Sequence, residues 1–358
     1  MSESGKQRAG GLGRGSSANG RAPTVIDVAR VAGVGKTTVS AVVHGREHVA
    51  PELRERVLAA IEELSYRPNI SARNLKLRRT DVIGVAAGDL LDPFNAEITA
   101  YMERQAAHHG LKILLTTSGM DHAHLGAVRD LMSHPVGAVL FIGAAVPAGL
   151  AKLSDPRVPF IFVTQRSKLG PSITVDNLCG GELATSHLIE LGHRRIVYLN
   201  VGYGPLSSQD YRARLAGYRR ALKRSKASIS EQVVRLAPSS TPEQRREALV
   251  EMLTSRKRPT AIFAATDQTA LELMQLAREL QLDVPEDVSI VGFDNIAFAA
   301  YSAVALTTIA QPIEELAYRA VDIAKTTLDG GTPAPGMAAL EPTLVVRRST
   351  APPRPTRA

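Results

Sequence analysis

Apolar residues recur at helical spacing in two short runs between Pro23 and His44, and Gly33-Val34-Gly35 separates the two runs. The first stripe comprises Val25, Val28, Ala29 and Ala32, and the second begins with Val39, Val42 and Val43. Thr24 can cap the first helix and Gly35 the second. Two short helices joined by a glycine-containing turn predict a helix-turn-helix.

The second helix of this unit turns small side chains outward. When its apolar stripe faces inward, the opposite face carries Thr37, Ser40, Ala41 and His44, and Lys36 lies beside them. Small uncharged side chains suit base edges in a major groove, and a lysine suits phosphate or guanine. The pattern therefore predicts DNA binding. Gly33–Thr37 also looks like the end of a phosphate-binding P-loop, but Arg30 occupies the position that needs glycine and no strand precedes it.

A third helix is predicted from Pro51 to Leu64, with Pro51 at its first position and an apolar stripe that completes a small bundle. Beyond it, Ile70–Leu77 is a candidate helix in which cations surround Leu75. Isolated helices of this length are unstable in water. The segment is either a hinge that folds against DNA and wedges Leu75 between base pairs in the minor groove, or an ordinary interdomain linker.

From Asp81 onward the pattern changes to strands that alternate with helices. The first series has strands at 82–87, 112–117, 137–142 and 159–163, with helices near 94–109, 121–132 and 148–153. The second has strands at 195–200, 231–236, 261–265 and 288–292, with helices near 178–191, 211–223, 242–255 and 269–280. Such alternation predicts parallel sheets covered on both faces. We therefore expect an all-α helix-turn-helix headpiece followed by an α/β core of two doubly wound parallel-sheet lobes.

Polar residues collect where the predicted strands end, which is the edge at which doubly wound sheets bind ligands. They are Asp89, Asp92, Gln165, Arg166, Asp176, Asn177, Asp267, Asp294 and Asn295. A cleft between the two lobes is the expected binding site for a small molecule. Each single aspartate has a second interpretation, because aspartate at such a position also caps helices.

The net charge of +8 lies mostly at the N-terminal end of the 358-residue chain. Residues 21–80 carry +5 and residues 1–20 carry +2, which leaves +1 for the rest of the chain. Basic charge concentrated in this way fits a nucleic-acid-binding module attached to a body with another task. Residues 1–22, rich in Gly, Ser and Arg, predict a disordered basic arm.

Cysteine content and hydropathy indicate the compartment. The single Cys179 excludes an intramolecular disulfide and fits a reducing environment. The N-terminus lacks the apolar core of a signal peptide. Residues 131–151 are uncharged and long enough to raise the question of a membrane span, but prolines and glycines divide them into strand-sized pieces. We expect a cytoplasmic protein that associates with the nucleoid and has no membrane partner.

Longer motifs resemble the lac repressor (LacI/GalR) family of bacterial transcription regulators. The N-terminal ones are TVIDVARVAGVGKTTVSAVVHG at 24–45, VAPELRERVLAAIEELSYRPN at 49–69 and ARNLK at 72–76. Those of the body are ITVDN at 173–177, LGHRRIVYL at 191–199, RLAGY at 214–218, RPTAIFAATD at 258–267, VPEDVSIVGFDN at 284–295 and LTTIAQP at 306–312. The resemblance covers roughly residues 23–350 without a large gap.

This resemblance implies a homodimeric repressor whose paired headpieces read a pseudo-palindromic DNA operator. It also implies a periplasmic-binding-protein-like core that takes a small effector, often a sugar or related metabolite. The chain would cross between the lobes near 164, 310 and 340, so that 312–328 packs in the N-terminal lobe and 340–346 returns to the C-terminal one. The implied parts are a headpiece at 23–68, a hinge at 69–80, a core at 81–350 and a disordered tail at 351–358.

The resemblance also assigns roles in DNA binding. Base-reading positions fall on Lys36 and Thr37, phosphate contacts on Thr38 and Ser40, and the minor-groove wedge on Leu75 with Ala72 and Lys76 beside it. Ala41 stands where many relatives carry Arg or His, so a base contact there shrinks to a methyl contact or is lost. His44 replaces a frequent Asn. The chain lacks the leucine-heptad tail that makes some relatives tetramers.

Arg214 and Asp294 are the strongest candidates for effector binding. A guanidinium donates two parallel hydrogen bonds, and an ionised aspartate accepts from hydroxyls. Gln165 stands where aspartate is common in the family, which alters the effector expected. Further candidates are Asp89, Phe94, Asn95, Arg166, Asn177 and Asp267. The chain has no Trp, so Phe94, Phe298 or Tyr203 would stack on a sugar ring.

Two other classes of protein share parts of this pattern. An α/β enzyme with an accessory DNA-binding head is disfavoured, because His108-His109 and His122-Ala123-His124 lack partners at metal-ligand spacing and no nucleophile elbow is present. We expect no enzyme activity, metal or cofactor. A transport-type solute-binding protein would share the core, but the headpiece and the missing signal peptide argue against it.

Overall fold

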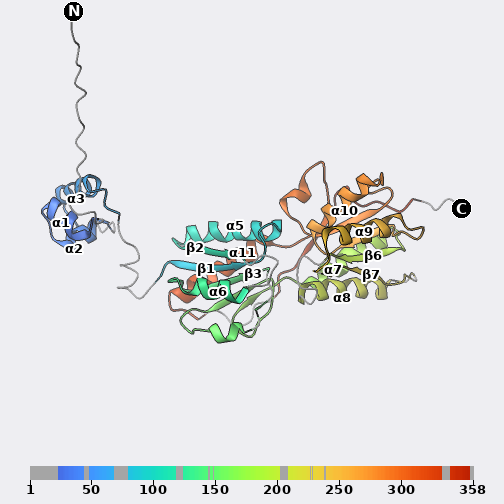
Figure 1. Cartoon of the computed structure of the whole chain (residues 1–358), viewed down its shortest axis with the longest axis horizontal. Helices are drawn as coiled ribbons and strands as arrows, with labels where there is room; N and C mark the ends of the chain where they lie inside the picture. Colours follow the sequence, from blue (N-terminus) through green and yellow to red (C-terminus); the bar gives the residue numbers. More distant parts are fainter. Residues whose placement is uncertain are drawn as a thin grey trace, which may run out of the picture. The chain divides into compact units, whose positions relative to one another are not determined.

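The computed structural model describes residues 23–43, 48–67, 80–117, 124–143, 146–147, 149–201, 209–225, 227, 229–237, 239–332 and 339–354. The chain forms two compact units, one ending at Arg78 and the other beginning at Arg79 (Figure 1). The predicted basic arm and hinge, including Ala72, Leu75 and Lys76, lie outside the described residues.

The N-terminal unit is a bundle of three helices, α1 (Val25–Ala32), α2 (Lys36–Val43) and α3 (Pro51–Glu63). The Asp27 carboxylate accepts hydrogen bonds from the Thr24 N–H and hydroxyl at 2.9 and 2.7 Å, which fixes the start of α1. Gly33 ends that helix with a φ of 64°, a conformation that glycine adopts without strain. Arg56 ties α3 to this turn by donating to the Ala32 carbonyl at 2.6 Å. The bundle core comprises Val28, Ala29, Ala32, Val39, Val42, Val57 and Ala60.

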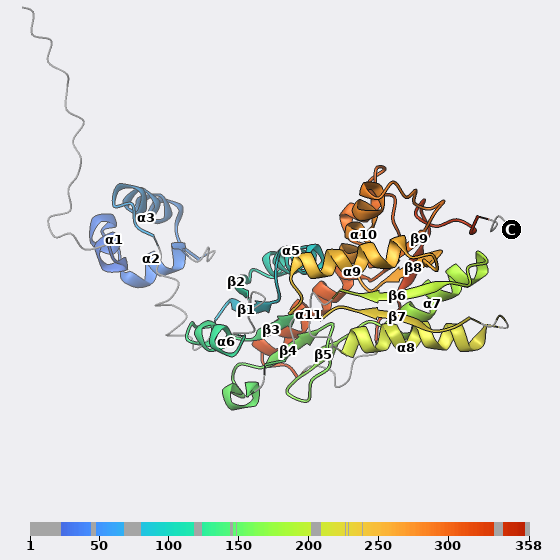
Figure 2. The ribbon, with the colours of Figure 1, turned by 45° about the vertical axis from the view of Figure 1, so that its right-hand side comes forward.

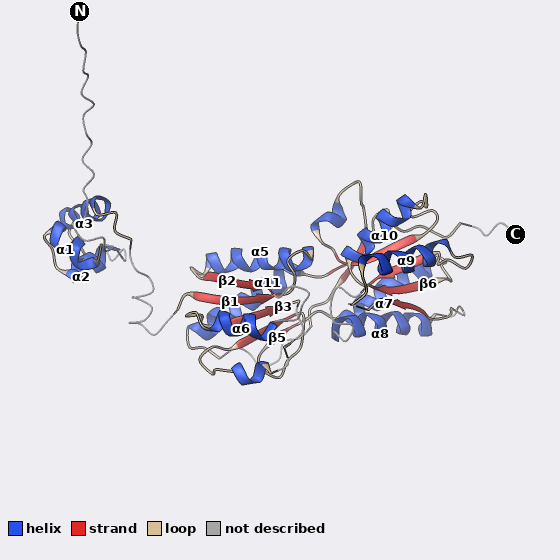
Figure 3. Ribbon diagram, in the orientation of Figure 1, coloured by secondary structure: helices blue, strands red, loops and turns tan. Residues whose placement is uncertain are grey.

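The N-terminal lobe of the second unit is built on a parallel five-stranded sheet of order β2-β1-β3-β4-β5. Its strands are β1 (Val82–Ala87), β2 (Lys112–Thr117), β3 (Val139–Ile142), β4 (Phe160–Val163) and β5 (Ser172–Ile173). Helices α5 (Pro93–His108) and α11 (Ile313–Leu328) pack together, and α6 (His124–Met132) packs on β1 and β2 from the opposite face (Figure 3). A 3-10 helix, η1 (Leu150–Leu153), follows β3.

The C-terminal lobe is built on a six-stranded sheet of order β11-β10-β9-β8-β6-β7, in which only the β10–β11 pair is antiparallel. Its strands are β6 (Ile196–Asn200), β7 (Gln232–Arg235), β8 (Ala261–Ala264), β9 (Ser289–Asp294), β10 (Thr307–Ala310) and β11 (Thr343–Val345). Its helices are α7 (Asn177–Glu190), α8 (Gln209–Arg224), α9 (Pro242–Thr254), α10 (Asp267–Glu279) and the 3-10 helix η2 (Ala297–Ala300). Figure 2 shows α7 and α8 on one side of these strands and α9 and α10 on the other.

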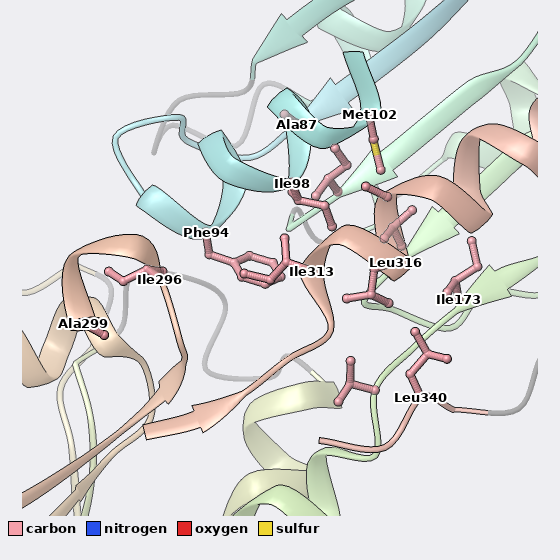
Figure 4. Close-up of a cluster of buried hydrophobic side chains, with 14 of the residues drawn as sticks. Ala87, Phe94, Ile98, Met102, Ile173, Ile296, Ala299, Ile313, Leu316 and Leu340 are labelled. Carbon is pink, nitrogen blue, oxygen red and sulfur yellow. The ribbon is translucent and has the colours of Figure 1, made fainter. Parts of the chain in front are cut away.

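The chain crosses between the lobes three times. The second crossing, Gln311-Pro312, leads from β10 into α11, and the third returns at Leu340, which pairs with Val175 beside it. One apolar cluster spans the junction and includes Phe94 and Ile313 from the N-terminal side and Ile296 from the C-terminal side (Figure 4). The fold expected from the sequence, a helix-turn-helix headpiece and a core of two α/β lobes, is confirmed.

Three details of the sequence-based expectation are wrong. The first crossing lies after Ile173 and not near residue 164, because β5 still pairs with β4 in the N-terminal sheet. A two-residue strand is too short to show any periodicity. Within the helix predicted near 148–153, Leu150–Leu153 is a 3-10 helix rather than an α-helix. Residues 351–354 are not disordered: the Ala351 carbonyl accepts from His193 Nε2 at 2.9 Å and from the Ser289 hydroxyl at 3.0 Å.

Hydropathy along the helices bears on the membrane question raised by residues 131–151. Val139–Ile142 in that stretch is the fully buried strand β3. Among the described residues, no helix combines the length and apolar character needed to cross a bilayer.

Helices α7 and α8 pack so closely that their backbones touch at glycines. A Cβ atom added to Gly217 would lie 2.2 Å from the Leu178 carbonyl oxygen, and one added to Gly181 would lie 2.1 Å from the Arg214 carbonyl oxygen. Backbone atoms of packed helices have no room to move aside. These glycines therefore set the distance between the two helices and, with it, the position of Arg214 on α8.

Substitution Gly217→Ala tests this packing. The added methyl group must push α8 away from α7, so we expect a loss of about 1–3 kcal/mol in the free energy of unfolding, seen as a lower Tm by circular dichroism. Gly126→Ala in α6 is the matched control, because a Cβ there meets nothing within 4 Å. It should leave the Tm unchanged or raise it, since alanine favours helix by about 1 kcal/mol. An unchanged Tm for Gly217→Ala would contradict the packing argument.

Candidate functional site

The outward face of α2 is polar, as the sequence predicts. Val39 and Val42 are buried against the bundle, whereas Lys36, Thr37 and Ser40 are exposed. Thr38 and Ala41 are half-buried at the edges of this face. His44 lies outside the described residues. The helix therefore presents a cation at its first turn followed by hydroxyls, which is a chemistry suited to phosphates and base edges.

Arg214 is the centre of a polar network in the C-terminal lobe. Its side chain is buried, and its Nε donates to Asn177 Oδ1 at 2.8 Å while Nη1 donates to the Ala265 carbonyl at 2.5 Å. The guanidinium also lies flat over the Phe293 ring, 3.6 Å from its centroid. Nη2 stands 3.7 Å from Asp294 Oδ1, beyond hydrogen-bond distance. One edge of the guanidinium thus faces the Asp294 carboxylate without donating a hydrogen bond to it.

Asp294, at the end of β9, lies opposite Arg214 in an unusual backbone conformation. Its φ is 125° and that of Asn295 is 57°, so the chain turns sharply as it leaves the sheet. Gln311 Nε2 donates to Asp294 Oδ1 at 2.6 Å. Burial raises the pKa of Asp294 well above its usual range, and the Arg214 charge opposes that effect. Gln311 belongs to the second crossing, so this hydrogen bond connects the network to the junction between the lobes.

Two further carboxylates lie near this network: Asp92, which the sequence places among the polar residues at the strand ends, and Asp210, which it does not single out. Asp92, the N-cap of α5, comes from the N-terminal lobe, and Asp210, in the first turn of α8, accepts from Asn177 Nδ2 at 3.0 Å. Burial raises the pKa of each to about 6, while the Arg214 charge lowers it. The signal for Asp92 in the sequence is its helix-capping position, because a residue there lies at the carboxyl edge of the sheet. Nothing local marks Asp210.

The N-terminal lobe contributes two amides at the ends of its strands. Asn95 is buried beside Gly143 after β3, and its Nδ2 donates to the Asp89 carbonyl at 3.0 Å. Its Oδ1 is a buried acceptor without a donor in the described part of the chain, and Gln165 Nε2, just after β4, is likewise a buried donor without an acceptor there. Buried polar atoms in native proteins are almost always paired. Both atoms lie at the carboxyl edge of the N-terminal sheet, the edge at which doubly wound sheets bind ligands.

The remaining sequence candidates occupy different places. Asp267 is fully buried, and its oxygens accept from the Thr308 hydroxyl at 2.5 Å and the Ile296 N–H at 3.0 Å, so it supports the end of β9 from within. Phe94 is buried in the apolar cluster at the lobe junction. Asp89 caps its own turn by accepting from the Leu91 N–H at 2.9 Å, and Arg166 is exposed. The structure thus brings together Asn177, Arg214 and Asp294.

Phe298, which the sequence offers as a stacking ring, lies outside this network. It is 46% exposed and packs edge-on against Tyr301, with ring centroids 5.5 Å apart. Tyr203 lies outside the described residues. His109, named among the metal candidates, pairs with Asp322 at 2.8 Å on the surface. No group of three or more potential metal ligands is found within the described ranges.

Two family models match the chain. The bacterial regulatory proteins of the lacI family match residues 24–69, and a periplasmic binding protein-like domain matches residues 185–350. The HTH-type transcriptional regulator DegA of Bacillus subtilis is 32% identical over 336 residues, 92% of this chain and 98% of that protein. The ribose operon repressor of Escherichia coli K12 is 33% identical over 305 residues, 84% of this chain and 91% of that protein.

Solved structures also match this chain. The lac repressor dimer bound to operator and the anti-inducer ONPF matches with a TM-score of 0.78 at 31% identity, over 92% of this chain and 100% of that chain. The match extends over nearly the whole length of both molecules. With its helix-turn-helix headpiece, its two-lobed core and relatives that are regulators rather than enzymes, this chain belongs to the lacI family of bacterial regulatory proteins.

Proposed function

We propose that this regulator binds a pseudo-palindromic operator as a homodimeric repressor and that a small molecule held between its lobes controls the binding. The proposed effector site is supported by two buried amide atoms without a partner among the described residues, Asn95 Oδ1 and Gln165 Nε2, at the edge of the N-terminal sheet. The C-terminal lobe offers Arg214 and Asp294 to the same ligand. A polyhydroxylated metabolite, such as the sugars that the names of some relatives indicate, would supply donors and acceptors to all four.

DNA recognition rests on the exposed face of α2. Lys36 and Thr37 read base edges, Thr38 and Ser40 contact phosphates, and Ala41 and His44 complete the face. Following the family, residues 69–80 fold as a hinge on the operator, with Leu75 wedged in the minor groove between Ala72 and Lys76. A regulator bound in this way is found with the nucleoid.

The homodimer is supported by exposed aromatic rings. Phe298 and Tyr301 pair on the surface beside η2, and Tyr301 is 57% exposed. Aromatic side chains are enriched at the centre of protein interfaces. A second copy of the chain that covers this pair would form the homodimer, and a homodimer supplies the two headpieces that a pseudo-palindromic operator requires.

Effector and operator are coupled through the lobes. The Gln311 side chain joins Asp294 to the crossing that leads into α11 of the N-terminal lobe. A ligand that draws Asp294 and Arg214 toward Asn95 and Gln165 shifts the lobes against each other. Because such coupling is reciprocal, effector changes operator affinity by the same factor as operator changes effector affinity.

Substitution Thr37→Ala tests base reading. An operator is first selected from random duplexes with the wild-type protein. We expect the variant to bind that operator with about 1–3 kcal/mol less free energy, which raises Kd roughly tenfold to a hundredfold. Its affinity for random DNA should not change. Lys36→Ala should likewise weaken binding to the selected operator, because Lys36 is proposed to read a base edge. Glu63→Ala, exposed on α3, is the control. Selection of sequences without inverted symmetry, or a monomeric protein in sedimentation, would contradict the proposal.

Substitution Gln165→Leu tests the effector site without destabilising the fold. Removing a buried donor that has no acceptor among the described residues should raise the Tm of the ligand-free protein, because an unsatisfied buried group costs about 1–3 kcal/mol. The same change should abolish the thermal shift and the operator response given by the best ligand in a screen of sugars and nucleosides. A bound ligand at 100 times its Kd adds about 2.7 kcal/mol, so its loss is measurable.

The control for this experiment is Gln275→Leu, since Gln275 lies on α10 and its amide donates to Glu279 at 3.1 Å. It should leave the ligand response intact. A Gln165→Leu protein that responds to ligand as the wild type does would remove Gln165 from the site.

A further inference from the structure

The side-chain amide of Asn177, at the start of α7, is held in one of its two orientations. Its Nδ2 donates to the Val175 carbonyl at 3.2 Å and to Asp210 Oδ1 at 3.0 Å, and its Oδ1 accepts from Arg214 Nε at 2.8 Å. A turned amide would set Nδ2 against the Arg214 donor and Oδ1 against two acceptors. Asn177 and Arg214 are buried, so a mispaired atom there would lose its hydrogen bond without replacement.

The two side chains that hold this amide come from one helix. Asp210 lies in the first turn of α8, and Arg214 follows it four residues later on the same helix. Side chains four residues apart lie on the same face of a helix, one above the other. Asp210 supplies the acceptor for the amide nitrogen and Arg214 the donor for the amide oxygen. The single amide of Asn177 is therefore bonded on both sides by α8.

The amide in turn limits the orientation of the Arg214 guanidinium. Nε donates to Asn177 Oδ1, Nη1 donates to the Ala265 carbonyl at 2.5 Å, and the Phe293 ring lies against one face. A guanidinium is planar and rigid, so fixing two of its nitrogens fixes the third. That third nitrogen, Nη2, makes no hydrogen bond within the described residues and lies 3.7 Å from Asp294 Oδ1. Nη2 is thus the nitrogen that remains for a ligand.

We propose that Asp210 is a positioning residue of the effector site: it orients the Asn177 amide, which in turn orients the Arg214 guanidinium toward the ligand. This inference rests on the effector site proposed above. An aspartate in the first turn of a helix has two simpler roles, a direct contact with the ligand and a favourable interaction with the helix dipole. Only the positioning role operates through Asn177.

A double-mutant cycle on the full-length protein separates these three roles. Asp210→Leu removes the acceptor, Asn177→Ala removes the amide, and a third variant combines both changes. Asp210→Asn removes the charge but keeps an acceptor oxygen. Glu243→Leu is the matched control, because Glu243 is the second residue of α9, as Asp210 is of α8, and is exposed. Burial raises the pKa of Asp210 to about 6, so measurements at pH 8 keep this carboxylate ionised.

The probes are D-ribose, cellobiose, D-glucose and adenosine, and calorimetry follows the one that the wild type binds most tightly. We expect Asp210→Leu and Asn177→Ala each to weaken its binding about tenfold, since each removes a hydrogen bond to a charged group. The double variant should bind within about twofold of Asn177→Ala, because Asp210 acts only through the amide. Asp210→Asn should stay within about threefold of the wild type, and Glu243→Leu should leave the affinity unchanged.

The same cycle is measured by urea unfolding of the ligand-free protein, followed by circular dichroism. Asp210→Leu should lower the unfolding midpoint in the wild-type background and much less in the Asn177→Ala background. This measurement depends on no ligand, and equal effects in the two backgrounds would overturn the inference by themselves.

Three binding results also overturn the inference and leave the proposed effector site standing. Additive losses in the cycle would mark a direct contact between Asp210 and the ligand. An Asp210→Asn protein as defective as Asp210→Leu would assign the effect to the charge at the helix end. Asp210→Leu that binds the probe as tightly as the wild type would remove Asp210 from the site.

Failure of the proposed function has a different signature. The wild type would then bind none of the four probes, or would bind one without a change in operator affinity measured by fluorescence anisotropy. The unfolding cycle would still decide whether Asp210 holds the amide.

Discussion

A buried guanidinium joins three elements of the C-terminal lobe at the carboxyl edge of its sheet. Arg214 joins the start of α7, the end of β8 and the end of β9 through Asn177, the Ala265 carbonyl and the Phe293 ring. Hydrogen-bond acceptors and an aromatic ring around most of the guanidinium offset the cost of burying its charge. The same interactions that keep the side chain in place leave its remaining edge facing Asp294, so the requirement for stability also sets the geometry of recognition.

Close packing of α7 and α8 makes that arrangement possible. Gly181 and Gly217 let the two backbones approach until a single methyl group would not fit, and Arg214 lies on α8 between them in the contact. The position of the guanidinium is therefore fixed by backbone contacts and not by a flexible side chain alone. Rigid support of this kind allows a ligand to displace whole lobes rather than merely reorient one residue.

The two lobes of the core are connected beside this network. Asp294 ends β9, Gln311 lies in the crossing that follows β10, and their side chains are joined at 2.6 Å. From that crossing α11 enters the N-terminal lobe and packs on α5, whose first turn carries Asp92 and Asn95. Candidate effector residues of both lobes thus lie on or beside the segments that connect the lobes. Under the proposed function, these segments are the element that effector and operator would both bias.

The sequence alone determined the order of elements, the three-helix headpiece with its outward α2 face, and the two α/β lobes, because each depends on local periodicity that spans several residues. It also indicated Asn177, Arg214 and Asp294. Only the tertiary structure decided that Asp267 is an internal support, that Asp210 bonds to Asn177 beside Arg214, and that Asn95 Oδ1 and Gln165 Nε2 have no partner among the described residues. Burial and hydrogen-bond pairing depend on contacts between segments that are distant in the chain. The residue pattern of one segment does not show which other segment packs against it.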